Sequence, residues 1–159
     1  MVTVSPPNPP TSAPAWTYTL HLPRDPRSPR IARATLRTVL SAHGLDVLVD
    51  TAELLTSELV TNAYRHSAGP AALRVRERDG GRGLRVAVWD TDRRVPPPFD
   101  GGLRPVPAAG ADGGRGLFLV CQYAHAWGGH TVDDDLFGRD GKLLWFELTA
   151  QPGAWAVAA

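Results

Sequence analysis

The sequence predicts an α+β fold, a two-layer α/β sandwich in which helices cover one face of a mixed β-sheet. Two observations support this prediction. Segments with strand and helix periodicity follow one another as strand, two helices, two strands, a long irregular segment, a short helix and two strands. The chain has 159 residues, of which 43% are hydrophobic, which suits one domain with a single core.

The predicted domain spans residues 16–150. Residues 1–15 are proline-rich and are expected to form a disordered arm, and residues 151–159 form a C-terminal tail. The first residues lack the basic and apolar regions of a secretory signal, and no segment reaches the about 18 apolar residues of a membrane span. A single cysteine, Cys121, allows no internal disulfide. We therefore expect a cytoplasmic protein.

The first three elements are predicted from their periodicity. Residues 16–22 (WTYTLHL) alternate and are rich in aromatic and β-branched side chains, which is typical of a strand. Residues 30–43 and residues 46–66 carry apolar side chains at helical spacing. Gly44 follows the first of these helices and is a suitable C-cap.

Two strands are expected next, ALRVRER and LRVAVWD, joined by DGGRG, whose Asp-Gly start suits a tight hairpin turn. The second strand is apolar almost throughout, as expected of a central strand, and it ends at Asp90. Residues 91–112 then show neither helix nor strand periodicity and are dominated by Pro, Gly, Ala and Arg. Such a long irregular segment inside a domain is usually a functional lid or is disordered.

The last elements are a short apolar helix and two strands. The helix lies in GGRGLFLVCQYAHAW, which begins with glycines. AWGGHTV and KLLWFELTA are predicted as closing strands around a polar loop, residues 133–141.

One polar stripe on the second helix is unusual. Glu58, Asn62 and His66 follow one another at four-residue steps and therefore share one helix face. One interpretation is a solvated helix edge. The other is a metal–nucleotide site, because an amide oxygen is a suitable Mg²⁺ ligand and a glutamate one turn away can orient or deprotonate a nucleophile.

Two further segments offer groups that a nucleotide can use. Asp90, at the end of an apolar strand, can accept a hydrogen bond from a buried exocyclic amine such as that of adenine, or can simply start a turn. The glycines of GGRGLFLV, residues 113–120, can make an ordinary turn or bring backbone amides at a helix start close to a phosphate. This segment matches neither the P-loop nor the dinucleotide-binding spacing.

Taken in this order, the three segments resemble the GHKL superfamily, which includes histidine kinases, the Hsp90 chaperone and the gyrase ATPase domain. ELVTNAYRH resembles its N box, VAVWDTD its first glycine box and GGRGLFLV its second. The resemblance covers about residues 16–149 and implies the Bergerat-type ATP-binding fold with an ATP lid. The compact form is similar to bacterial anti-sigma-factor serine kinases, and the closing WGG…GKLLWFEL is similar to small actinobacterial regulatory ATP-binding proteins.

The resemblance implies a role for each matching residue. Glu58 would be the general base, Asn62 the Mg²⁺ ligand and Asp90 the contact to the adenine amino group. His66 would either close the pocket or cap its helix. The segment beside the phosphates of ATP would consist of Gly113, Gly114, Arg115, Gly116 and Leu117, with the arginine either reaching a phosphate or solvated.

The sequence departs from the family pattern in two places. The first glycine box usually reads Asp-x-Gly-x-Gly, whereas here Asp90 is followed by residues 91–94, TDRR. Without glycines the backbone adopts positive φ only at a cost, so its path beside the adenine must differ. Family members often carry a threonine near the adenine on the last strands, where this chain has Leu143 and Leu144.

We therefore expect an ATP-binding regulator with Mg²⁺-dependent serine/threonine protein kinase activity that acts as an anti-sigma factor. The expected substrate is an anti-anti-sigma-type protein, with a sigma factor as second candidate partner. The alternatives are a non-catalytic nucleotide-binding module and a detached histidine-kinase catalytic domain. The last is disfavoured because no predicted dimerising hairpin with a phosphoacceptor histidine precedes the N box.

The charge balance bears on the other partners. The formal net charge of +1 gives no case for nucleic-acid binding, and no membrane partner is expected. Relatives of this type often dimerise, so a homodimer is a candidate assembly. Lys142 is the only lysine among 17 basic residues, a bias that we assign to genome composition rather than to chemistry.

Overall fold

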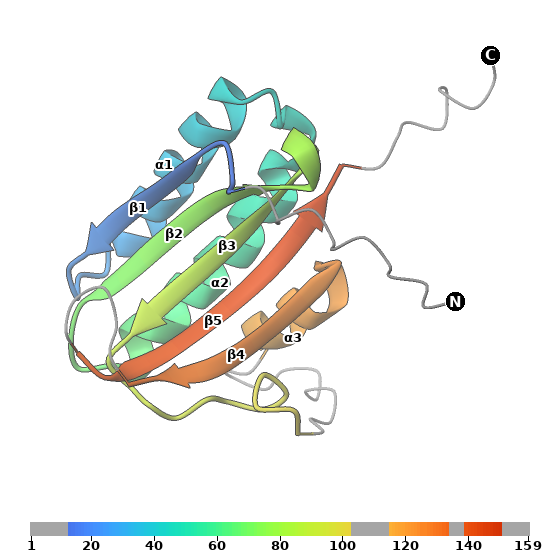
Figure 1. Cartoon of the computed structure of the whole chain (residues 1–159). Helices are drawn as coiled ribbons and strands as arrows, with labels where there is room; N and C mark the ends of the chain where they lie inside the picture. Colours follow the sequence, from blue (N-terminus) through green and yellow to red (C-terminus); the bar gives the residue numbers. More distant parts are fainter. Residues whose placement is uncertain (1–12, 103–114, 134–138, 151–159) are drawn as a thin grey trace, which may run out of the picture.

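The computed structural model describes residues 13–102, 115–133 and 139–150. Within these ranges, one five-stranded sheet carries the α-helices on a single face (Figure 1), which confirms the predicted two-layer arrangement. The elements are β1 (Thr17–Leu22), α1 (Ser28–Ala42), a 3₁₀ turn (Asp46–Leu48), α2 (Val49–His66), β2 (Ala71–Arg78), a second 3₁₀ turn (Asp79–Gly81), β3 (Gly83–Asp90), α3 (Arg115–Tyr123), β4 (Ala126–Val132) and β5 (Gly141–Thr149).

The prediction of a mixed sheet is wrong for the described strands. The strand order is β1-β2-β3-β5-β4, and every neighbouring pair is antiparallel. The two helices α1 and α2 lie between β1 and β2 in the chain, and β2 runs in the opposite direction to β1. β5 inserts between β3 and β4, and these two strands of equal direction therefore never pair. β3 occupies the middle of this order, which confirms the prediction that this apolar strand is central.

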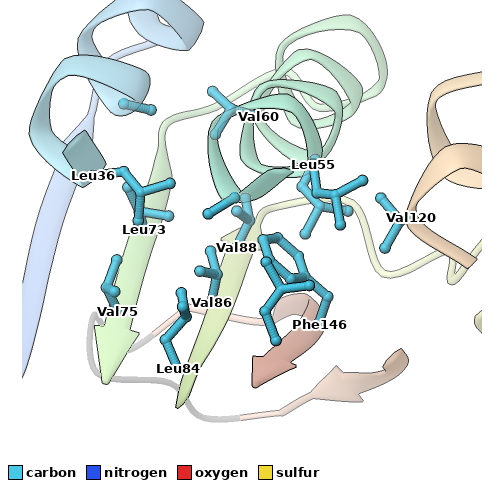
Figure 2. Close-up of a cluster of buried hydrophobic side chains, with 14 of the residues drawn as sticks. Leu36, Leu55, Val60, Leu73, Val75, Leu84, Val86, Val88, Val120 and Phe146 are labelled. Atoms are coloured by element: carbon cyan, nitrogen blue, oxygen red, sulfur yellow. The ribbon is translucent and has the colours of Figure 1, made fainter. Parts of the chain in front are cut away.

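The core lies between the sheet and the helices. Alternate side chains of β2, β3 and β5 face the helices, among them Val75, Val86 and Phe146, which occupy neighbouring positions in the sheet register. Figure 2 shows these side chains beneath Leu55 and Val60 of α2. All five are at most 2% exposed. Burying such side chains holds α2 across the middle strands, and this packing fixes where its polar stripe points.

Positive backbone angles occur at the predicted turns. Gly44 has φ +71° and ends α1, as expected of a C-cap glycine. In the predicted hairpin between β2 and β3, Asp79, Gly80 and Gly81 all have positive φ. The turn chemistry of both segments was therefore predicted correctly. None of the helices in the described ranges combines the length and apolar composition needed to cross a bilayer.

Candidate functional site

A cavity of about 560 Å³ lies beside the C-terminal half of α2. The segment after β3, the start of α3 and the start of β5 complete its wall. The lining residues are Glu58, Thr61, Asn62, Arg65, His66, Asp92, Arg94, Val95, Pro96, Pro97, Gly116, Leu117 and Lys142. Its volume is within the about 300–1,000 Å³ that is usual for small-molecule sites.

The polar stripe of α2 borders this cavity over its whole length. Leu55, Leu59 and Ala63 turn inward to the core, and the stripe lies on the adjacent side of the helix. Glu58 and Asn62 are half-buried, whereas His66 is exposed at the end of the helix. All three predicted residues thus line one site. His66 borders the cavity and is also the last residue of α2, so its position agrees with both sequence-based interpretations.

Asn62 carries an unusual polar atom. Its Oδ1 is fully buried, and no described residue donates a hydrogen bond to it. A buried acceptor without a donor costs about 1–3 kcal/mol, so it is expected to be satisfied by a ligand when the site is in use. An amide oxygen in this position suits a hard cation such as Mg²⁺.

Gly116 brings α3 into direct contact with Glu58. A Cβ atom at position 116 would overlap the Glu58 carboxylate and lie 3.3 Å from Glu58 Cβ. Any residue larger than glycine at this position therefore requires the Glu58 side chain to move. No described residue forms a hydrogen bond or ion pair with the Glu58 carboxylate. The general-base candidate and the glycine segment consequently meet at one point of the cavity.

Gly116→Ala is expected to destabilise the fold by about 1–2 kcal/mol, because the added methyl group must push Glu58 aside. Denaturant unfolding of this variant measures the cost. Glu58→Ala supplies a matched background, since without the carboxylate most of the overlap disappears and the cost of Gly116→Ala should fall. An equal cost in both backgrounds would show that Glu58 is not the obstacle.

Asp90 is the last residue of β3 and is paired with Lys142. The two residues are directly opposite on β3 and β5, and Lys142 Nζ lies 3.0 Å from Oδ1 and 2.9 Å from Oδ2 of the carboxylate. Asp90 is 2% exposed and Lys142 1%. Burial raises the pKa of Asp90, and the hydrogen bond from Lys142 opposes this shift. Lys142 borders the cavity, whereas Asp90 is not among the lining residues.

Lys142 is one of the lining residues of the candidate site that sequence reasoning did not name, as are the cations Arg65 and Arg94. The available signal for Lys142 was its singularity, since the chain otherwise uses arginine for every basic position. A compact ammonium on a flexible stem can be buried against one carboxylate where a planar guanidinium with five donors is harder to satisfy. The assignment of this lysine to genome composition alone therefore overlooked its position.

The chain after β3 turns without glycines. Asp90 Oδ1 accepts a hydrogen bond from the Asp92 backbone N–H at 2.8 Å, and Asp92 Oδ1 accepts one from the Arg94 N–H at 3.0 Å. Two successive aspartate turns thus replace the backbone freedom of the missing glycines. The Ser67 and Thr91 hydroxyls, 2.6 Å apart, tie this segment to the end of α2.

The remaining predicted residues divide into three groups. Gly113 and Gly114 lie outside the described residues, as do residues 103–112 of the lid segment expected over residues 91–112. Arg115 begins α3 and is exposed, and it does not border the cavity. Leu117 lines the cavity and is also part of the core, at 5% exposure.

Comparison with known families decides the relationship of this chain. A family model described as the histidine kinase-like ATPase domain matches residues 22–134, well over half of the sequence. The chain belongs to this family. No curated protein is similar enough to the chain to match it. The matched residues of this histidine kinase-like ATPase domain include the α2 stripe, Asp90 and α3. Lys142 lies after the last matched residue.

The cavity of this ATPase domain fits Mg²⁺ with a nucleotide. The orphaned Asn62 oxygen offers one metal ligand. Among the described residues, no three His, Cys, Asp or Glu side chains gather into a metal cage. Mg²⁺ commonly takes most of its ligands from phosphates and water, so a single protein ligand is consistent with its chemistry. Asn62 would hold the ion, and the ion would neutralise phosphate charge.

Proposed function

We propose that the protein binds Mg-ATP in this cavity and transfers the γ-phosphoryl group to a serine or threonine of a protein partner. The observation that carries the proposal is the convergence of Glu58, Asn62 and Gly116 on one cavity. Membership of a histidine kinase-like ATPase family supports the use of ATP. Serine or threonine as the acceptor and the regulatory role rest on the sequence resemblance, and the proposed cytoplasmic location rests on the single cysteine and the absence of a secretory-signal pattern.

The proposed reaction requires little covalent chemistry from the protein. The hydroxyl oxygen of the acceptor forms a bond to the γ-phosphorus, the bond from the γ-phosphorus to the β–γ bridging oxygen breaks, and ADP leaves. Glu58 takes the hydroxyl proton. The cations Arg65 and Arg94 line the same cavity and favour the polyphosphate. Positioning and charge neutralisation are therefore the main contributions of these side chains.

The proposed partner is a small protein of the anti-anti-sigma type, with a sigma factor as the second candidate, and the protein would act as an anti-sigma factor in a partner-switching system. The resemblance of the compact domain to anti-sigma-factor serine kinases supports this proposal. A histidine kinase-like ATPase domain that only binds nucleotide, and one that modifies histidine, are the competing functions.

Incubation of the full chain with γ-labelled ATP, Mg²⁺ and proteins captured from the source cells tests the proposal. Alkali-labile, acid-stable label on a partner serine or threonine is the expected result. Nucleotide binding without transfer to any captured protein would favour the non-catalytic module, and acid-labile label on histidine would favour the histidine-kinase function. Omission of Mg²⁺ serves as the control for metal dependence.

Asn62→Ala is expected to remove the metal-dependent part of ATP affinity, about tenfold or more, because the buried, unpartnered amide oxygen of Asn62 is lost. Calorimetric titration with ATP, in Mg²⁺ and in EDTA, measures the difference. Asn62→Asp is the matched variant, since it keeps an oxygen ligand and should retain metal dependence. If the wild-type affinity is the same with and without Mg²⁺, Asn62 is not a metal ligand.

A further inference from the structure

The face of the sheet that points away from the helices carries a group of arginines. In Figure 1 this face is turned toward the viewer, and none of the described helices covers it. Arg74, Arg76 and Arg78 occupy alternate positions of β2. Leu73 and Val75 precede two of these arginines and belong to the core on the helix side. Because successive side chains of a strand point to opposite faces, the three arginines lie on the open face.

A fourth arginine, on β3, completes the group. Arg85 is directly opposite Arg76 in the sheet register. Arg85 and Arg78 both lie 2.6 Å from the Glu147 carboxylate, which accounts for one of the four charges. The strands of this face therefore carry a net charge of +3, on a chain whose formal total is +1. We define the arginine face as Arg74, Arg76, Arg78 and Arg85.

This concentration of charge is unfavourable for the chain on its own. Like charges directly opposite in an antiparallel pair destabilise a sheet. Burial lowers the pKa of Arg76, and the nearby Arg85 and Arg78 guanidinium groups lower it further. No described residue forms a hydrogen bond or ion pair with Arg74 or Arg76. A local cost without a compensating contact is expected where a surface serves a function.

The side chains of this face also limit what can bind there. In a two-fold dimer built on it, a second copy would bring the same positive charges against one another. A single-stranded nucleic acid binds through aromatic rings on which its bases stack. Of the two tryptophans on the open face, Trp89 is buried. The Trp145 ring packs on Gly128 and holds the Arg85 guanidinium 4.0 Å from its centroid. An acidic polypeptide needs only the cations, which this face provides.

The arginine face is separate from the nucleotide cavity. Lys142, which lines the cavity, is opposite Asp90 in the register of β3 and β5. Asp90 is five residues after Arg85 on β3, which corresponds to about 17 Å along a strand. The α2 stripe of the cavity is on the other side of the sheet, in the helix layer. A molecule on the arginine face therefore leaves the cavity open.

We propose that the arginine face is a docking surface for an acidic segment of a partner protein. The carboxylates of the segment pair with Arg74 and Arg76 and share Arg78 and Arg85 with Glu147. This inference goes beyond the proposed function, because docking at this face requires neither nucleotide nor phosphoryl transfer. It gives the protein a contact to a partner that is independent of the state of its nucleotide site.

Fluorescence anisotropy with a labelled peptide of alternating Glu and Ser residues, titrated with the full chain, tests the proposal. Binding is expected at about 50 mM salt and should weaken at about 300 mM, because exposed charges are screened. Saturating Mg-ATP should change the peptide affinity by less than about twofold, since the two sites are separate. Absence of peptide binding at low salt would overturn the proposal and leave the proposed function standing, because this titration contains no nucleotide.

Two charge reversals locate the binding surface. Arg76→Glu should lower peptide affinity at least about fivefold, because it reverses the charge at the centre of the arginine face. The new carboxylate would be opposite Arg85, so the sheet exchanges a like-charge pair for an opposite-charge pair and the variant should fold. Arg30→Glu, at an exposed position of α1, changes the net charge equally and should lower affinity less than about twofold. Equal losses in the two variants would reduce the binding to general charge attraction and overturn the proposal.

Two further measurements distinguish the other occupants. Single-stranded oligo-dT of the same length is expected to bind more weakly than the acidic peptide. Tighter binding of oligo-dT that is lost in Arg76→Glu would assign the face to nucleic acid instead. Sedimentation velocity is expected to give the same oligomeric state for wild type and Arg76→Glu. A wild-type dimer that dissociates in Arg76→Glu and persists in Arg30→Glu would assign the face to a second copy and overturn the proposal.

Discussion

Glu58→Gln is expected to lower phosphoryl transfer by about 10²–10⁴-fold, the usual contribution of a general base. The variant keeps the size of the side chain and its hydrogen-bonding capacity and removes the proton acceptor. Glu58 touches the start of α3 and carries no described hydrogen bond, so the substitution breaks no described contact of the fold. ATP affinity is expected to change little, since the proposed metal ligand Asn62 and the cations Arg65 and Arg94 of the cavity remain.

The measurement is paired. Nucleotide affinity and phosphate incorporation into one purified partner are determined for wild type and variant. Glu53→Gln is the matched control, because Glu53 lies on the same helix, pairs with Arg37 at 2.7 Å and is not a lining residue of the cavity. Transfer by Glu58→Gln at the wild-type rate would refute the catalytic assignment. Equal loss of affinity and transfer would make Glu58 a binding residue instead.

Lys142→Met is expected to lower the free energy of unfolding by about 3–5 kcal/mol, the usual cost of removing one partner of a buried ion pair. The cost arises because the Asp90 carboxylate stays buried without a counter-charge. Asp90→Asn in the same chain should recover most of the loss, since it removes the stranded charge. Denaturant unfolding of the single and double variants measures both effects. If Lys142→Met alone is as stable as wild type, the ion pair does not contribute to the free energy of unfolding.

The pH dependence of this variant has a defined sign. Burial raises the pKa of Asp90 in the folded state, and loss of Lys142 removes the interaction that opposes this shift. The folded variant therefore binds a proton more tightly than the unfolded chain does. The contribution of protonated Asp90 to the stability of the variant is fully present below the ordinary aspartate pKa of about 3.9. This contribution is lost as the pH rises through the raised pKa of the folded state. A stability deficit that shrinks with rising pH would contradict this assignment.

Much of the site could be predicted because it lies in short segments. The stripe of Glu58, Asn62 and His66 depends only on helical spacing, and the helix itself depends on apolar periodicity. A central position for β3 followed from its continuous apolar run. Local patterns of this kind survive into the structure because each segment buries the face that its own sequence makes apolar.

The ion pair at the end of β3 could not be predicted in the same way. Asp90 and Lys142 are 52 residues apart, and their pairing depends on the register of β3 against β5. That register exists only because β5 inserts between β3 and β4, the arrangement that also makes the described sheet antiparallel. Neither fact has a local signature, since a strand pattern specifies the faces of a strand and not its neighbours.

The sequence by itself thus determined the order of the elements, the two-layer class and the residues of the α2 stripe, because periodicity and turn chemistry act over a few residues. Only the tertiary structure decided which strands pair, that Gly116 packs on Glu58, and that Lys142 pairs with Asp90 beside the cavity. These depend on packing and charge burial between distant segments, and a buried charge must find its partner wherever the fold places one.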